Sequence, residues 1–167
     1  MATAMANGAK YERKYLAHFI DSSFNSTTPT YTRLGKDLEE YAIELNPEVE
    51  TKANILGEST TNVKGYAPQS TVDPYYAYKG DALFEHLADI INNRETGSSL
   101  ETTVVDVLLA SDGAVEWAYK EKVVIVPSSI GGGGDGVAIP FDVYYVGERT
   151  KGTFDVSTKT FTAETTE

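Results

Sequence analysis

Two histidines, His18 and His86, are the side chains best suited to acid–base catalysis or metal binding near neutral pH. Neither has a second histidine, or a carboxylate at a metal-ligand spacing, that forms a recognised site. The chain has no cysteine, so it holds neither a disulfide framework nor a thiolate zinc site. His86 falls beside Glu85 and Leu87 in a helical pattern. We therefore expect packing or surface roles for both histidines.

A run of glycines, GGGGDG at residues 131–136, has the composition of a phosphate-binding loop. No Gly-Lys-Ser/Thr sequence follows it. The next segment, VAIPFDVYY at 137–145, is typical of a strand and not of a helix whose N-terminus would hold phosphate. The run therefore predicts a flexible loop that joins two strands.

Paired carboxylates are the catalytic groups of glycosidases, and the chain is rich in acids. The adjacent acids Glu39 and Glu40 would point to opposite faces of a strand, so they cannot flank one bond. The sequence also lacks a nucleophile elbow, a Cys–His arrangement and a calcium loop. We predict that the protein is not an enzyme and uses no catalytic residue, cofactor or metal.

The composition fits one domain with a hydrophobic core of its own, since 41% of the 167 residues are hydrophobic. Asp and Glu (25) outnumber Lys and Arg (14), which gives a formal charge of −11 and disfavours conventional nucleic-acid binding. No window approaches the roughly 18 consecutive apolar residues of a membrane helix. The first residues lack the basic and apolar regions of a secretory signal. We expect a soluble protein, made in a cytoplasm, with no membrane partner.

Residues 1–30 show no sustained period and include the Ser/Thr/Pro-rich segment 22–30, which is typical of an extended arm. Large apolar side chains in this arm fit a short amphipathic helix or a strand. Such side chains need a surface to cover, either on the domain itself or on a neighbouring chain. The residues concerned are Tyr11, Tyr15, Phe19 and Phe24.

From Tyr31 the pattern becomes strand-like. Residues 40–45, EYAIEL, alternate charged or small residues with large apolar ones, which predicts a half-buried strand with one charged face. Asn46-Pro47 breaks this strand, and residues 48–53 continue it. We predict a β-hairpin here whose polar face lies in solvent or lines a water-filled space.

Residues 57–80 have no clean period and exceed the roughly 12–15 residues beyond which a loop is usually functional or disordered. Disordered segments contain few aromatics, whereas this one holds four tyrosines, a residue enriched at interfaces. We predict a projecting loop or hairpin that orders on assembly. Its candidate contact residues are Tyr66, Tyr75, Tyr76 and Tyr78.

A helix is predicted over about residues 81–94, with Asp81 at its N-terminus, an apolar stripe on one face and Gly97 as the terminator. Strands are predicted at 100–110, 115–126 and 137–145, with a short hairpin around Ser157-Thr158. We predict an α+β, mainly β fold: an antiparallel β-sandwich or barrel at 31–163 with one flanking α-helix, a long loop and extended terminal arms, the last at 164–167.

The segments 31–46 (YTRLGKDLEEYAIELN) and 50–87 resemble the major tail tube proteins of siphophages that infect Gram-positive bacteria. In this family a strand pair with the reading R-L-G-K-D-L-E precedes a loop with Gly, Tyr, Pro and Gln, an Asp-Pro turn and a helix. Here these are residues 33–39, 65–69, Asp73-Pro74 and 81–93. The resemblance covers about residues 31–163, and its motifs are structural, so they are less specific than a catalytic signature.

The resemblance implies a β-sandwich or barrel that assembles into hexameric rings, stacked into a tube in a virion tail. It implies contacts with the tape measure, tail tip and terminator proteins, and double-stranded DNA that passes through without specific binding. Long loops and arms make contacts between subunits, which is the role we expect for the arm and loop aromatics named above. An acidic lumen would repel DNA phosphates. As its lining we predict Glu40, Glu44, Glu48 and Glu50.

Three alternatives remain. A subunit of the inner tube of a contractile tail or phage-derived bacteriocin would assemble by the same physical contacts, so the sequence does not separate it from a siphophage tube subunit. A carbohydrate-binding or capsid decoration module would stack sugars on Tyr75, Tyr76, Tyr78 and Trp117, and would stay monomeric. An enzyme is the class that the sequence supports least.

Overall fold

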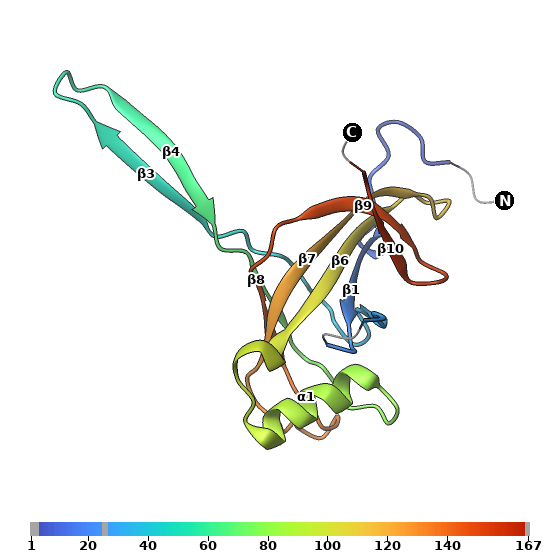
Figure 1. Ribbon diagram of the computed structural model, residues 1–167. Coiled ribbons are helices and arrows are strands. Elements are labelled where there is room, and N and C mark those ends of the chain that lie inside the picture. The colour runs from blue at the N-terminus through green and yellow to red at the C-terminus, as the bar shows by residue number, and fades with distance from the viewer. Residues whose placement is uncertain (1–3, 25–26, 166–167) are drawn as a thin grey trace.

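The computed structural model describes residues 4–24 and 27–165, and it confirms an α+β, mainly β chain built on a curled antiparallel sheet (Figure 1). Residues 1–3 and 25–26 of the predicted arm, and residues 166–167 of the predicted tail, lie outside the described residues. The strands of the main sheet are β1 (Leu16–Asp21), β2 (Tyr31–Leu34), β5 (Gln69–Val72), β6 (Glu101–Leu109), β7 (Val115–Pro127), β8 (Phe141–Tyr145), β9 (Thr150–Asp155) and β10 (Thr160–Ala163).

The long strand β7 organises the sheet. It pairs with β6 along one side, and on the other side with β9 near its start and with β8 near its end. Pairing continues from β6 through β1 to β2, and from β8 to β5. The strand β2 therefore lies at one edge of the sheet, β5 and β10 lie at the edges beyond β8 and β9, and every pairing is antiparallel.

Both faces of the sheet are covered. On β6, Val104 packs in one cluster with helix α1 (Ala82–Asn93), while Val105 and Val107 pack in a second cluster under the β9–β10 hairpin. Phe154 of β9 is 1% exposed in this second cluster. A strand buried on both faces reads as a nearly continuous apolar run, which is the pattern that predicted β6.

Helix α1 confirms the predicted helix. Asp81 caps it, because the Asp81 side chain accepts a hydrogen bond from the Leu83 amide at 3.0 Å. The helix ends at Arg94, which adopts a left-handed conformation (φ 51°), and not at the predicted Gly97. Gly97 instead begins a short 3₁₀-helix, Gly97–Leu100.

The predicted arm is shorter in the structure, because β1 is an inner strand of the sheet. It lies between β2 and β6, and five of its six residues are buried. A 3₁₀-helix at Arg13–Tyr15 precedes it. The sequence left a helix or a strand open for this segment, because its apolar residues fit both periods.

The predicted hairpin around residues 40–53 was wrong in its pairing. Residues 40–45 contribute only an isolated bridge between Glu44 and Gln69. The strand β3 (Pro47–Ala53) pairs instead with β4 (Ser59–Tyr66), within the segment predicted to project. This β3–β4 hairpin extends away from the body of the molecule (Figure 1). The glycine run 131–136 lies in the connection from β7 to β8, as predicted.

Candidate assembly surfaces

The β3–β4 hairpin forms a two-stranded sheet of its own, separate from the main sheet. Nearly all its residues are exposed, including Val49 (54%) and Val63 (52%). A lone two-stranded hairpin is marginally stable in water, so its strands need further contacts to be held firmly. The hairpin thus presents a surface that the chain itself leaves uncovered.

The tip of the hairpin, residues 54–58, is an ordered turn. The Asn54 side-chain oxygen accepts hydrogen bonds from the amides of Leu56 (2.9 Å) and Glu58 (3.0 Å). The Asn54 side-chain nitrogen donates to the Glu58 carboxylate at 2.7 Å. These bonds hold the turn with Ile55 102% exposed and Leu56 78% exposed. Sequence reasoning missed this pair, although two adjacent aliphatic residues between Asn54 and Gly57 were its signal.

The four acids predicted to line a lumen do not share one strand face. Glu48 and Glu50 lie on β3, where the Glu50 carboxylate pairs with Lys64 (3.1 Å) and Lys52 (3.4 Å). Glu40 and Glu44 are exposed in the segment before the hairpin, and the Glu44 backbone exchanges hydrogen bonds with Gln69 at 2.8 and 2.9 Å. Their role as a lining stays a prediction.

The tyrosines of residues 57–80 separate into exposed and anchored groups. Tyr66, at the base of the hairpin, is 62% exposed, and Tyr78 is 41% exposed. Tyr75 is half-buried: its ring packs against Phe141, and its hydroxyl donates to Asp81 at 2.6 Å. Burial, reinforced by this bond, raises the pKa of Tyr75. Tyr76 is half-buried and bridges to residue 138 through the backbone. Tyr66 and Tyr78 are therefore the better candidates for contacts with other chains.

The aromatic residues of the predicted arm divide in the same way. Tyr11 is 41% exposed and Tyr15 is half-buried. Phe19 (1% exposed) and Phe24 (7%) lie in the chain's own core, with Phe24 stacked on His86 at 4.0 Å. The prediction that Phe19 and Phe24 contact a neighbouring subunit was wrong, because β1 and the turn after it fold into the domain.

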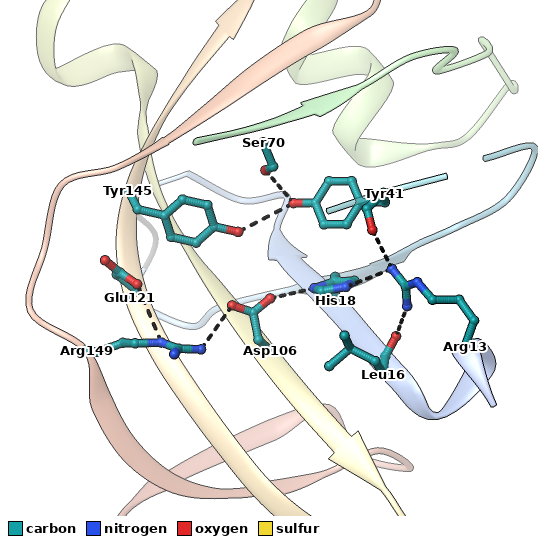
Figure 2. A network of polar contacts seen from close by, with 9 residues as sticks. All are labelled: Arg13, Leu16, His18, Tyr41, Ser70, Asp106, Glu121, Tyr145 and Arg149. Carbon is teal, nitrogen blue, oxygen red and sulfur yellow. Dashed lines mark hydrogen bonds and ion pairs between the residues drawn. The ribbon is translucent and has the colours of Figure 1, made fainter. Parts of the chain in front are cut away.

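A buried polar network crosses one face of the sheet, and Figure 2 shows its members. His18 Nδ1 lies 2.6 Å from the Asp106 carboxylate, and His18 Nε2 lies 3.1 Å from the Arg13 guanidinium. Arg149 approaches both Asp106 and Glu121 at 3.7 Å. Sequence reasoning missed this network, whose partners come from distant strands.

His18 and Asp106 are paired as in a catalytic dyad, and although both side chains are almost fully buried, each also lines a surface pocket. Because the Arg13 guanidinium can only donate, His18 Nε2 accepts and His18 Nδ1 donates to Asp106. Both ring nitrogens are thus occupied. The hydroxyls of Tyr41 and Tyr145 lie beside the network, and burial raises the pKa of both. Burial also raises the pKa of Glu121. The arrangement fixes β1, β6 and Tyr41 to one another.

A pocket with a volume of about 520 Å³ opens at the β2 edge of the sheet. Four of the chain's 14 basic residues line it, together with three leucines and two acids. The lining basic residues are Arg13, Lys14, Arg33 and Lys36. We call it the basic pocket.

Within the described ranges, no group of three or more His, Asp or Glu side chains is arranged to hold a metal ion. No helix among the described residues is long and apolar enough to span a membrane.

The fold is shared with components of contractile injection systems. The chain is similar to the sheath/tube terminator of the extracellular contractile injection system PVC, with 9% identity and a TM-score of 0.56 over 89% of this chain and 100% of that one. It is also similar to the tube-terminating cap of the anti-feeding prophage, with 11% identity and a TM-score of 0.54 over 89% and 95% of the two chains. No protein-family model and no curated protein sequence matches the chain. At these identities the likeness shows a common fold.

Proposed function

We propose that this protein is a structural subunit of a phage-type tail tube, which forms rings of six that stack around a lumen. It works in a virion tail and in contact with other tail proteins. Its chemistry is assembly, not turnover.

The β3–β4 hairpin is the observation that carries this proposal. It is exposed along both strands, lies outside the main sheet and ends in the uncovered pair Ile55 and Leu56. Exposure of aliphatic side chains to water is unfavourable, so a partner that covers those on this ordered turn lowers the free energy of the system. A ring-forming subunit uses such a projection to reach its neighbours.

Two further features support assembly. The strands β2, β5 and β10 each pair on one side only, and closing a ring covers such edges. The formal charge of −11 suits a wall past which DNA slides without binding. The acids that face the lumen in this proposal are Glu40, Glu44, Glu48 and Glu50.

A tube terminator or cap is the second candidate, and the fold likeness to two such proteins favours it. A terminator forms one ring at the end of a tube and stops there, whereas a tube subunit adds ring upon ring. The inner tube of a contractile tail would behave like the tube subunit. A glycan-binding module would remain a monomer.

Sedimentation velocity over a concentration series separates these candidates. We expect a tube subunit to give species whose size grows continuously with concentration. A single species of ring size that stays constant would assign the chain as a terminator. A monomer at every concentration would overturn the proposal.

A further inference from the structure

We propose that the basic pocket of one copy receives the hairpin tip, residues 54–58, of a second copy. This inference rests on the proposed function and names the contact that joins neighbouring subunits. The occupant is a segment of the same chain, carried by another molecule.

The tip and the pocket match in polarity. The tip offers two aliphatic side chains, Ile55 and Leu56, followed by one carboxylate, Glu58. The pocket combines an aliphatic lining with basic groups at its exposed positions. The aliphatic lining residues are Leu16, Leu34 and Leu38. Entry of the tip would remove apolar surface from water on both partners.

The two surfaces are also complementary in charge. Four basic residues and the acids Glu39 and Glu40 line the pocket, which gives 4 − 2 = +2 in a chain whose formal charge is −11. Among the ion pairs of the described residues, none joins a pocket cation to Glu39 or Glu40, and Lys14 pairs with Glu12 outside the pocket. The tip carries the single charge of Glu58. Only one Glu58 oxygen is bound by Asn54, so the other remains for a cation of the pocket.

Internal hydrogen bonds hold two of the four basic groups, those of Arg13 and Arg33, in place before any partner arrives. Arg13 donates to the carbonyls of Leu16 (2.6 Å) and Tyr41 (2.9 Å). Arg33 donates to the carbonyl of Lys14 at 2.8 Å. Preorganised cations lose less conformational entropy on binding, which favours recognition of a carboxylate.

The positions of tip and pocket exclude a contact within one chain. The hairpin leads directly into β5, and the pocket reaches β5 through its lining residue Tyr41, whose hydroxyl lies 2.7 Å from Ser70 Oγ, while the tip itself is uncovered, with Ile55 102% exposed. The hairpin also extends away from the body (Figure 1). A projecting tip on one copy and a different surface, the pocket, on the next make a head-to-tail contact, which repeats into a closed ring or an open stack.

Cross-linking between two different single-cysteine variants tests this contact. The native chain has no cysteine, so Leu56→Cys and Glu39→Cys each introduce the only thiol. After the two variants are mixed at an assembling concentration and mildly oxidised, we expect a disulfide-linked heterodimer. The bond requires the two Cα atoms to come within about 7 Å. The matched control replaces Glu39→Cys by Asn92→Cys, an exposed position on α1 outside the pocket.

Exchanging the charges of the two surfaces provides an independent experiment. Glu58→Arg and Arg33→Glu should each raise the concentration needed for self-association about tenfold, and the two together should restore it to within about threefold of the parent. Circular dichroism checks that each variant keeps its fold.

The outcomes separate the inference from the function on which it rests. If the parent assembles but the Leu56–Glu39 pair cross-links no better than the control, the docking contact is overturned while the tube proposal stands. If the parent never associates, both are overturned. Selective cross-linking with restoration by the charge exchange supports the contact.

Discussion

His18 and Asp106 lie directly opposite each other on the paired strands β1 and β6, with His18 Nδ1 2.6 Å from the Asp106 carboxylate. Both side chains are almost fully buried, at 7% and 3% exposed. A pair this deep joins the first strand of the chain to the middle of the sheet. It makes the N-terminal segment part of the domain.

Replacing Asp106 tests this connection. Asp106→Asn keeps the size of the side chain but leaves His18 and Arg149 without their buried carboxylate. We expect the free energy of unfolding to fall by about 3 kcal/mol. Urea denaturation measures the change. The control Asp89→Asn, at an exposed position on α1, should lie within about 0.5 kcal/mol of the parent. Equal effects of the two substitutions would contradict a structural role for the pair.

The raised pKa of Glu121 gives a dependence on pH. Burial disfavours the charged form of Glu121 in the folded state, so the parent loses stability as pH rises from the ordinary glutamate pKa through the raised one. Glu121→Gln removes this penalty. We expect the variant to match the parent at pH values below the ordinary pKa of glutamate and to exceed it by less than about 1 kcal/mol at pH 7. Urea denaturation at both pH values measures the difference, and a less stable variant at pH 7 would show that the contact with Arg149 outweighs burial.

Phe19 and Tyr11 separate the core from the assembly surface. Phe19 packs on Phe154 with ring centroids 4.6 Å apart, so Phe19→Ala should lower the free energy of unfolding by about 3–5 kcal/mol. Tyr11 is exposed, and Tyr11→Ala should change the free energy of unfolding by less than about 0.5 kcal/mol. Thermal and urea unfolding of both variants test this contrast. If Phe19→Ala changed the free energy of unfolding only slightly, Phe19 would again be a candidate for contacts with a neighbouring subunit.

Local patterns account for the parts of the fold that the sequence predicted. The apolar stripe after Asp81 predicted α1, and Asp112-Gly113 predicted the turn between β6 and β7, where Gly113 adopts φ 87°. The segment of β1 stayed open between helix and strand, because its apolar residues fit both periods. The hairpin was misplaced because β3 and β4 are exposed on both faces, so neither burial nor alternation marks them.

The candidate sites depend on contacts that no local pattern encodes. His18 and Asp106 are 88 residues apart, and only the pairing of β1 with β6 brings them together. The basic pocket likewise gathers residues from before β1 and after β2. Tyr66 and Tyr78 are exposed and stay predicted contact residues, whereas Phe19, an aromatic residue predicted on the same grounds, lies inside the core.

The aliphatic tip of the hairpin provides a direct mutational test of assembly. Because Ile55 and Leu56 contact little within the chain, Ile55→Ser with Leu56→Ser should leave the free energy of unfolding within about 0.5 kcal/mol of the parent. The same double variant should lose most self-association in sedimentation experiments. The control Ile130→Ser removes an exposed aliphatic side chain elsewhere and should assemble normally. Unchanged assembly of the double variant would contradict a role for the tip.

Negative-stain electron microscopy of the purified protein over a concentration series shows whether the protein builds tubes. We expect rings at low concentration that stack into hollow tubes of constant diameter as the concentration rises. A field of single particles of monomer size at every concentration would contradict this expectation.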